Sequence, residues 1–474
     1  MQLIQGFMTI FHPITLMLII GGVSVGIVFG AIPGLSAFTC LAIMLPLTFT
    51  MEPVNGICFL MAIYVGGCSG GLISAVLLGI PGTPSSIATC FDGYPMAKRG
   101  EARRALGTGV VFSFIGGIFG ALILTFLGPA IAKVALQFSP YEYFAVILFA
   151  LTTVSSLSEG NMAKGLLSCL LGISIAFVGI DQLSAYTRYT MNIKELAAGF
   201  NLVPILIGVF AVSQILEAAA ARKFPKPPTS LNIVKAEKVK GFGLSWKELW
   251  QQMKVATPSA LIGLVVGILP GIGGNVSNLM AYAFAKKRSK HPERFGTGIL
   301  DGIVAPETAN NATVGGALII LLTLGIPGDN ATAMILAGFQ LHGITPGPLL
   351  FKTSAGMIYA LFAAFMLANL VMLIVEYFGL PVFTKLLTVP SSYLLPVVIA
   401  FCVVGSFSAN NRVFDIMVMM LFGFLGLLMK RFGYPLAPMV VGFILAPMLE
   451  ENLRRSLMRT NGSFLPIIQS PIAL

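Results

Sequence analysis

The chain has 474 residues, of which 56% are hydrophobic and 10% are charged, and its mean hydropathy is +0.91. Soluble domains carry about 25% charged residues, so this composition excludes an ordinary water-soluble protein. The net charge is +11, and 17 of the 29 basic residues fall in three loops between apolar segments, 98–104, 222–254 and 286–294. This placement argues against nucleic-acid binding and for loops at a membrane surface.

The six cysteines are scattered through apolar segments and the chain has three histidines. These residues predict neither a disulfide framework nor a structural metal site. The N-terminus lacks the basic region of a secretory signal, and its apolar run continues well beyond the length of one.

The first half opens with an apolar stretch over residues 18–48, which surrounds Pro33-Gly34 and predicts a hairpin that turns inside the membrane. The apolar stretch 56–79 follows and runs into Gly-Ile-Pro-Gly, where a helix must stop or break. The basic stretch 98–104 marks a cytoplasmic loop, because such loops concentrate Lys and Arg.

Four apolar segments then lead to the long hydrophilic stretch 222–254, and they cover residues 105–128, 141–158, 164–181 and 198–220. We interpret 222–254 as a cytoplasmic linker. It ends in a short amphipathic helix that begins at Ser245, carries both Trp residues of the chain and is expected to lie along the membrane interface.

The second half opens with residues 255–285, which are uncharged and hold Pro270-Gly271 near their middle. Because basic stretches flank both ends, either a re-entrant hairpin or two tightly linked crossings fits this segment. The segment 304–324 then runs into a second Gly-Ile-Pro-Gly, and four more apolar segments close the chain at 355–378, 391–407, 413–430 and 434–450.

Three motifs recur in the two halves in the same order, which predicts an internal duplication. The offsets are 237, 246 and 250 residues, for the pairs that begin at Gly30 and Gly267, Gly79 and Gly325, and Asp92 and His342.

The basic stretch 286–294 corresponds to residues 49–57, which hold no basic residue. Loops that are equivalent in sequence but differ in basic charge are expected on opposite sides of the membrane, which indicates that the two halves are inverted. The predicted domains are a first repeat at 1–221, the linker at 222–254 and a second repeat at 255–474. The predicted fold is an all-α polytopic membrane protein with two inverted-topology repeats, re-entrant hairpins, discontinuous helices and about 10–12 membrane segments.

Small hydroxyl or amide residues follow each of the four helix breaks. A helix that begins inside a membrane presents free N–H groups and a positive dipole end to an anion, and a helix that ends there presents carbonyls to Na⁺. The alternative is that the breaks only ease tight packing. The expected substrate-binding residues are Pro33, Gly34, Ser36, Thr83, Ser85, Ser86, Gly271, Gly273, Asn275, Ser277, Asn310, Asn311, Asn330 and Thr332. The residues expected around a coupling ion are Gly34, Gly82, Glu307, Gly328 and Asp329.

Glu307 is an unusual charge beside an uncharged segment, and ionisable residues in membrane segments are functional by default. It is either a coupling-ion or proton group, or a solvated side chain at the cytoplasmic mouth. The chain shows no HExxH motif and no Walker lysine, so no catalytic residue, enzyme activity or cofactor is expected beyond a bound Na⁺. Without a nucleotide site, transport would draw on an ion gradient.

Several longer motifs are distinctive, namely Pro33-Gly-Leu, Gly79-Ile-Pro-Gly-Thr-Pro-Ser-Ser86 with Asp92-Gly-Tyr-Pro-Met-Ala-Lys-Arg-Gly100, and Ala305-Pro-Glu-Thr-Ala-Asn-Asn-Ala312 with Leu324-Gly-Ile-Pro-Gly328. Through them nearly the whole chain resembles the large membrane subunit of the tripartite tricarboxylate transporter family (TctA type). Asp329-Asn330 departs from the smaller residues expected there, which leaves the local ligand set open.

The resemblance implies a secondary transporter, a symporter driven by Na⁺ or H⁺, that imports citrate-like tricarboxylates, dicarboxylates or related organic acids. It implies a multi-pass protein of the bacterial inner membrane, with a small four-helix membrane subunit and a periplasmic solute-binding protein as partners, no nucleic acid, and a homodimer as an open question. Fold analogy adds an elevator motion. The alternatives are a channel or a solute carrier for a different small solute and, less favoured, a membrane enzyme.

Overall fold

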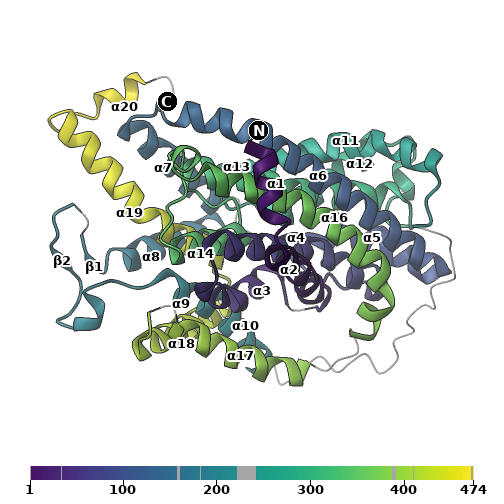
Figure 1. The fold of residues 1–474 in the computed structure, drawn as a ribbon, viewed down its shortest axis with the longest axis horizontal. Coiled ribbons are helices and arrows are strands. Elements are labelled where there is room, and N and C mark those ends of the chain that lie inside the picture. Colours follow the sequence, from purple (N-terminus) through teal and green to yellow (C-terminus); the bar gives the residue numbers. More distant parts are fainter. Residues whose placement is uncertain are drawn as a thin grey trace.

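The computed structural model describes residues 2–33, 35–156, 161–181, 183–220, 242–386, 391–408, 410–470 and 473. Within these ranges the regular secondary structure is helical except for one two-stranded antiparallel hairpin, β1 (Gly179–Ile180) and β2 (Thr187–Arg188), in which Gly179 pairs with Arg188. Long helices lie side by side along the longest axis of the molecule, and the β1–β2 hairpin projects at one end (Figure 1).

The helices of the first half are α1 (Gln2–Ile10), α2 (Pro13–Ala31), α3 (Ala37–Met44), η1 (Leu45–Thr50), α4 (Pro53–Leu78), η2 (Pro84–Ser86), α5 (Ile87–Met96), η3 (Ala97–Glu101), α6 (Ala102–Ala135), α7 (Pro140–Ser156), α8 (Met162–Ala176), η4 (Lys194–Leu196), α9 (Leu202–Leu206), η5 (Ile207–Val212) and α10 (Ser213–Ala220). Those of the second half are α11 (Trp246–Ile268), α12 (Gly273–Arg288), η6 (Pro292–Arg294), α13 (Asp301–Leu324), α14 (Asn330–Leu341), α15 (Leu350–Thr353), α16 (Ala355–Leu386), α17 (Ser391–Ser408), α18 (Val413–Arg431), α19 (Leu436–Arg459) and α20 (Leu465–Gln469).

Among the described residues, six helical stretches are long and apolar enough to cross a membrane: Pro13–Ala31, Pro53–Leu78, Pro84–Ala135, Ala355–Gly379, Val413–Arg431 and Leu436–Arg459. Shorter apolar helices accompany them. The prediction of an all-α polytopic membrane protein is confirmed. The number of membrane segments, about 10–12, stays a prediction.

The element order repeats as the sequence motifs do. In the first half α2 breaks before α3, and α4 ends before η2 and α5; in the second half α11 breaks before α12, and α13 ends before α14. The residues that end α4 and α13, Gly79 and Gly325, adopt the same left-handed conformation with φ of 68° and 74°. A left-handed C-terminal residue is usually glycine, because other side chains are strained there.

Repeat-equivalent helices run in opposite directions. The end of α4 at Gly79 lies against Tyr94 of α5, and the start of α13 at Gly302 lies against Asp92 of the same helix. At the far end, the start of α4 lies against His342 and the end of α13 lies against Pro346. An antiparallel arrangement of equivalent helices is the geometry that inverted repeats require.

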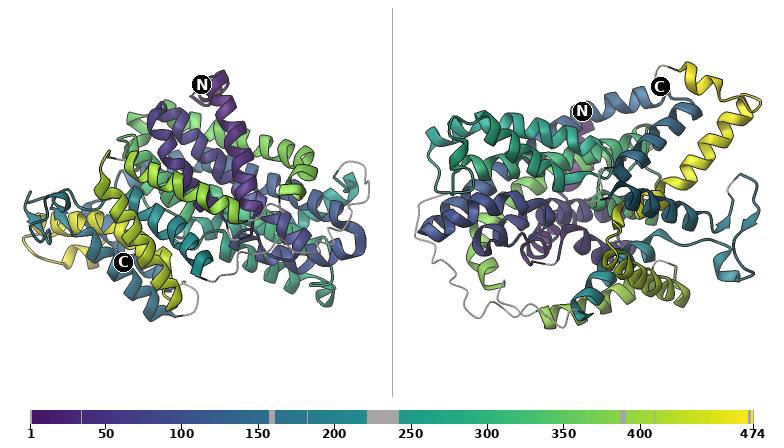
Figure 2. Two further views of the ribbon diagram at one scale, coloured as in Figure 1. Left: turned by 90° about the horizontal axis from the view of Figure 1, so that it is seen from below. Right: turned by 180° about the vertical axis from the view of Figure 1, so that it is seen from behind.

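The two basic stretches meet at one end of the molecule. Arg99 donates to the backbone carbonyl of Gly298 at 2.5 Å. Asp92 of α5 accepts from the backbone N–H groups of Gly298 and Ile299 at 2.7 and 3.0 Å and from the Tyr282 hydroxyl of α12 at 2.9 Å. One buried carboxylate therefore joins the first repeat to the α12–α13 connection, and the β1–β2 hairpin projects at the opposite end (Figure 2).

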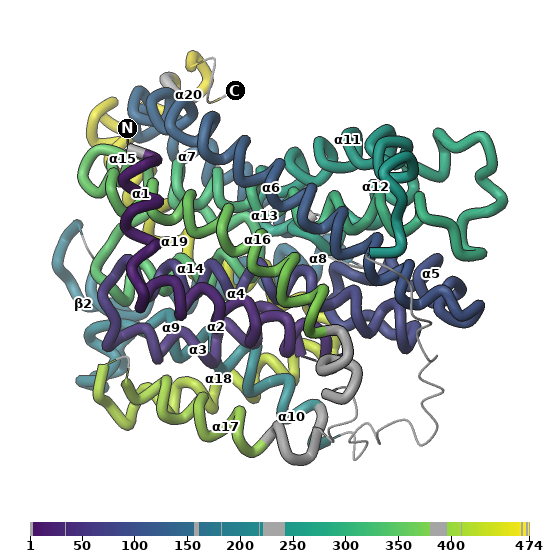
Figure 3. Tube along the Cα trace, turned by 45° about the vertical axis from the view of Figure 1, so that its right-hand side comes forward, coloured from purple at the N-terminus to yellow at the C-terminus, as the bar shows by residue number. Residues whose placement is uncertain are grey.

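In each repeat the helix before the first break packs through glycines against the long helix that follows. These pairs are α2 with α4 and α11 with α13 (Figure 3). Gly26 of α2 lies against the Ile63 carbonyl of α4, and Gly263 of α11 lies against the Ala309 carbonyl of α13. Gly26 and Gly263 are separated by the motif offset of 237 residues. Small residues allow backbones to approach closely, which drives helix association in membranes.

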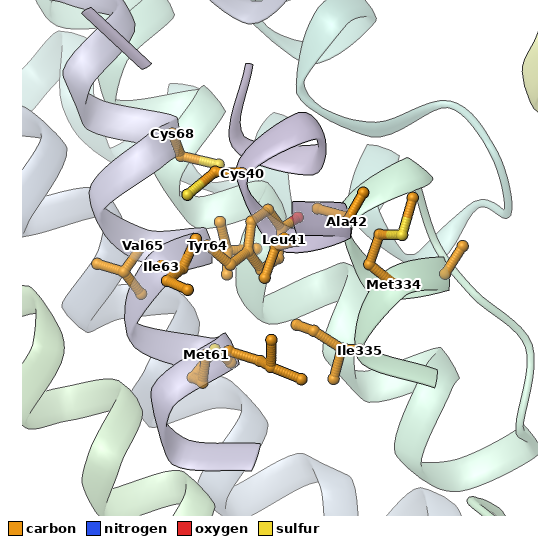
Figure 4. Close-up of a cluster of buried hydrophobic side chains, with 14 of the residues drawn as sticks. Cys40, Leu41, Ala42, Met61, Ile63, Tyr64, Val65, Cys68, Met334 and Ile335 are labelled. Carbon is orange, nitrogen blue, oxygen red and sulfur yellow. The ribbon is translucent and has the colours of Figure 1, made fainter. Parts of the chain in front are cut away.

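The central core lies where α3, α4 and α14 meet. Leu41, Ile63, Tyr64 and Met334 are buried there, and Figure 4 shows their side chains facing one another between the three helices. The cysteines Cys40 and Cys68 also lie in this region as free thiols, as the sequence predicts.

The predicted linker is revised where the structure describes it. Ser245 and Glu248 form a capping box that starts α11, and the helix continues from Trp246 to Ile268 without a break. The boundary at 254 therefore falls inside α11, because no helix-ending residue stands between the amphipathic segment and the hairpin arm. The part of the linker at 222–241 lies outside the described residues, and the interfacial position of the two Trp side chains stays a prediction.

We expect Gly26→Ala and Gly263→Ala each to lower the thermal unfolding midpoint of the purified protein, because overpacking a close contact costs about 1–3 kcal/mol. Gly21→Ala is the matched control on α2, since a methyl group there would meet nothing within 4 Å. If Gly26→Ala were as stable as Gly21→Ala, the close contact would not stabilise the α2–α4 pair.

Candidate substrate-binding site

Four helix starts, two from each repeat, face one cavity of about 390 Å³. The residues that precede these starts all line it: Ser36 before α3, Thr83 before η2, Ile272 before α12 and Asp329 before α14. Between them the cavity is lined by side chains of α4 and α13, the long helices of the two repeats. The predicted helix breaks therefore meet at a single place.

The sequence explains why helices begin at these positions. Ser36 accepts a hydrogen bond from the Thr39 N–H at 3.3 Å, and Asp329 accepts one from the Thr332 N–H at 2.8 Å. Thr83 with Ser86 and Asp329 with Thr332 form reciprocal capping boxes that are 246 residues apart, as are the motifs that contain them. Side-chain oxygens at these positions satisfy N–H groups that the helix cannot.

The α12 start differs from the others. Its N-cap residue is Ile272, which provides no side-chain hydrogen bond, so the N–H groups of the first turn are not capped by a neighbouring side chain. Gly271 and Gly273 have φ of 74° and 60°, a conformation that favours glycine. The Gly271 N–H donates to the Gly328 carbonyl at 2.7 Å, which holds the tip of the α11–α12 hairpin against the break before α14.

The α11–α12 hairpin ends inside the molecule. Gly267, close to its tip, lies against the Thr313 carbonyl and Gly316 of α13, while α13 continues to Leu324. Of the two alternatives for residues 255–285, this geometry supports the re-entrant hairpin over two full crossings.

Asp329 is the acidic residue that lines the cavity. Its carboxylate accepts from the Tyr64 hydroxyl as well as from the Thr332 N–H. Lys430 is the basic residue of the lining, and it pairs with Glu217 at 3.0 Å near the surface. The helix starts that face the cavity carry positive dipole ends and are a further source of positive charge there.

Asn310 of α13 is 1% exposed and lines the same cavity. Its Nδ2 donates to the Cys68 carbonyl of α4 at 3.1 Å, whereas its Oδ1 has no hydrogen-bond partner within the described structure. A buried acceptor without a partner is costly, so this oxygen is available to a hydrogen-bond donor or a cation that enters the cavity. Gly274 lies directly against this oxygen, so a side chain at 274 would obstruct it.

Most of the predicted residues meet at this cavity. Those that line it are Ser36, Thr83, Ser85, Gly271, Gly273, Asn275, Asn310, Asn330 and Asp329. Pro33, Ser86, Ser277, Asn311 and Thr332 lie outside the lining, and Gly34 lies outside the described residues.

The residues outside the lining have local partners instead. Ser277 bonds Thr313, and Asn311 donates to the Glu307 carbonyl of its own helix. Ser86 and Thr332 complete the capping boxes. Hydroxyl and amide side chains in helices readily form such local bonds, so residue type alone did not separate them from the lining residues.

The residues predicted for a coupling ion are dispersed. Gly82 lies against the Gly30 carbonyl and Gly328 against Ala317, so both allow close backbone packing rather than line the cavity. Glu307 is fully buried away from the cavity, where it accepts from Thr89 of α5 and Ser113 of α6 at 2.5 and 2.9 Å. The alternative of a solvated Glu307 at the cytoplasmic mouth is therefore wrong for this conformation.

Sequence reasoning missed several lining residues: Tyr64, Cys68, Phe210, Gln214, Lys430 and Tyr434. One of them carried a usable signal. Tyr64 stands 246 residues before Asn310, the offset of the motif that follows it. Cys68 lies on α4 beside Tyr64, and the remaining residues come from η5, α10, α18 and the segment just before α19, which no motif links to the breaks.

A second cavity of about 460 Å³ lies beside the β1–β2 hairpin. Its charged groups neutralise one another, since Arg188 pairs with Glu450 at 2.8 Å and Arg454 pairs with Asp181 at 2.6 Å. The Ser184 hydroxyl and the Arg454 guanidinium hold the pKa of Asp181 well below its usual range. None of the predicted site residues lines this cavity. The cavity at the four helix starts is therefore the better candidate for a substrate-binding site.

Comparison with known proteins identifies relatives over the whole chain. A protein of Agrobacterium vitis named "Uncharacterized 52.8 kDa protein in TAR-I ttuC' 3'region" is 35% identical over 471 residues, which cover 99% of this chain and 92% of that protein. Another from the same organism, "Uncharacterized protein in TAR-II ttuC' 3'region", is 36% identical over 211 residues, 44% of this chain and 87% of that protein. No solved structure matches the chain.

Residues 16–441 match the family described as "Tripartite tricarboxylate transporter TctA family". This match spans α2 to the first turns of α19 and so includes all four helix starts of the cavity. The chain therefore belongs to the tripartite tricarboxylate transporter TctA family.

Proposed function

We propose that this protein is the large transmembrane subunit of a binding-protein-dependent secondary transporter that imports a tri- or dicarboxylate, or a related organic acid, with a Na⁺ or H⁺ gradient. The observation that carries the proposal is the convergence of four helix starts on one cavity in a chain of this family. Helix N-termini bind carboxylates without a buried Lys or Arg.

The α12 start is the strongest candidate for a substrate carboxylate, because no side chain caps it and Asn275 of its first turn lines the cavity. The α3 start faces the same space from the other repeat. Two separate helix ends suit a substrate with more than one carboxylate.

The α14 start is already occupied by the Asp329 carboxylate, which would repel a substrate anion unless a cation accompanied it. The unpartnered Oδ1 of Asn310 lines the same cavity and adds a neutral oxygen. We propose that Asp329 and Asn310 belong to the coupling-ion site, because oxygen ligands suit Na⁺.

The remaining expectations form part of the same proposal. The protein would lie in the bacterial inner membrane, with a small four-helix membrane subunit and a periplasmic solute-binding protein as partners, and the inverted repeats would move as an elevator. Residues 1–221 and 255–474, with the second extended back to Ser245, would be the two transmembrane repeats. It would act as a transporter and catalyse no reaction, and a homodimer is compatible with it.

The experiment is uptake of a panel of carboxylates into proteoliposomes that contain the two membrane subunits, with the binding protein added outside. We expect uptake that requires the binding protein and an imposed Na⁺ or pH gradient. Uptake of uncharged solutes, or uptake that requires neither the binding protein nor an ion gradient, would favour a channel or a carrier for another solute.

We expect Asn275→Ala to reduce carboxylate uptake by roughly 10- to 100-fold, because a hydrogen bond to a charged group contributes about 1.5–3 kcal/mol. Asn452→Ala is the control, since in the described contacts the Asn452 side chain bonds only the Met448 carbonyl of its own helix. Normal uptake by a folded Asn275→Ala protein would remove the α12 start from the substrate site.

Asp329→Asn should abolish Na⁺ stimulation of uptake while α14 remains folded, because Asn caps a helix about as well as Asp but carries no charge. Asp301→Asn, at the start of α13, is the control for removal of a carboxylate elsewhere. Unchanged Na⁺ dependence in Asp329→Asn would assign Asp329 a capping role alone.

A further inference from the structure

Glu376 of α16 is a second fully buried carboxyl in the membrane region, and it lies outside the cavity. Its Oε2 accepts from the Ser69 hydroxyl of α4 at 2.9 Å. Its Oε1 has no hydrogen-bond partner within the described structure.

Two other buried acids show how this protein holds a carboxylate that serves the architecture. Asp92 accepts from three backbone N–H groups and a tyrosine, and Glu307 receives a hydroxyl on each oxygen. Glu376 has a single donor, so its environment does not compensate for the loss of water around a charge.

The elements packed against α16 supply no nearby positive charge among the described side chains. These elements are α1, α2, α4, α6 and α15. The helices α1, α2 and α4 contain no charged residue, the cations of α6 lie near its ends at Arg103, Arg104 and Lys133, and α15 carries Lys352 in a turn at the far end of α16. Arg104 is paired with Glu248.

The remaining titratable groups on α16 and on the helices packed against it carry no positive charge among the described side chains. On α16 they are Tyr359 and Tyr377, and on α4 they are Cys58, Tyr64 and Cys68. Glu307 of α13 is a further buried acid and likewise offers no positive charge. An unpaired carboxylate in such a place costs several kcal/mol, so the neutral acid is the stable form.

Ser69 connects this acid to the substrate cavity. It follows Cys68, which lines the cavity and whose carbonyl accepts from Asn310. The letters of 67–71 match the Gly-x-Ser-x-Gly pattern of hydrolases, but Ser69 lies inside α4, whereas a nucleophile elbow requires a turn from strand to helix. Its hydroxyl is thus a partner of Glu376 rather than a nucleophile.

We propose that Glu376 is a proton-binding site of this protein. It holds a proton in the conformation described here, as a carboxylic acid, and releases it to water as a carboxylate when α4 and α16 separate during transport. Only α4 stands between Glu376 and the cavity, so an ionised Glu376 would repel an anionic substrate there. Protonation of Glu376 therefore favours substrate binding, and protons would move inward together with the carboxylate. The transport part of this inference rests on the proposed function, whereas the protonation itself does not.

The direct test is infrared difference spectroscopy on the full chain in lipid vesicles, between neutral and alkaline buffer. We expect the wild type to show the carbonyl stretch of a protonated carboxylic acid at neutral pH and Glu376→Gln to lose that component. The control is Glu101→Gln, which removes an exposed carboxyl and should leave the band unchanged. A band that Glu376→Gln does not reduce would overturn the proposal.

Ser69→Ala provides a second variant that keeps the acid. Loss of the Ser69 hydroxyl should shift the frequency of the same component without removing it, because the carboxyl loses its hydrogen-bond donor. An unshifted band in Ser69→Ala would assign the signal to another carboxyl and also overturn the proposal.

The transport readout uses proteoliposomes that contain both membrane subunits, with the binding protein added outside. Uptake of a carboxylate from the panel that the wild type transports is followed over a series of external pH values. We expect the pH dependence of wild-type uptake to be lost in Glu376→Gln, which imitates the protonated state, and to be retained in Glu101→Gln. A pH profile in Glu376→Gln identical to that of the wild type would overturn the coupling role. Failure of the wild type to take up any carboxylate of the panel would contradict the proposed function, while the infrared result would still decide the protonation.

Discussion

The backbone at the start of a helix inside a membrane has N–H groups that neither water nor its own helix can satisfy. In this protein four such starts converge, and the rest of the fold places them there. Three are satisfied by side chains of their own residues, Ser36, Thr83 and Asp329, whereas the start of α12 has no side-chain cap. A fold that gathers these N–H groups around one cavity provides a place for an anion. The need to satisfy them connects the repeats, the glycines at the breaks and the proposed site.

The two repeats share a backbone plan but differ in the side chains that face the cavity. Tyr64 and Asn310 occupy equivalent positions on α4 and α13, and Thr83 and Asp329 occupy equivalent positions at the breaks that follow. Inversion brings both pairs to the same cavity. The second repeat contributes the carboxylate of Asp329 and the buried amide of Asn310, whereas the first contributes the hydroxyls of Tyr64 and Thr83. Duplication thereby supplies the architecture, and divergence between the copies supplies chemical asymmetry, which a site for both an anion and a cation needs.

Three of the buried acids, Asp92, Glu307 and Glu376, differ in how many hydrogen-bond donors surround the carboxyl group. Asp92 is surrounded by donors and joins the two repeats, and Glu307 is held by hydroxyls from two helices of the first repeat. Glu376 has one donor and no compensating charge among the described side chains. Since the cost of a buried charge depends on how many donors surround it, the number of partners separates architectural acids from those able to exchange a proton.

The sequence by itself determined the membrane class, the internal duplication, the opposite directions of the repeats and the positions of the helix breaks, because hydropathy, charged loops and Pro-Gly pairs act locally along the chain. Only the tertiary structure decided which polar residues after the breaks face the cavity, because a helix turns each successive side chain to a different face: Asn275 lines the cavity and Ser277 bonds Thr313 behind it. It also decided that Glu307 is buried away from the site and that Glu376 meets Ser69, contacts between segments far apart in the chain that no local pattern encodes.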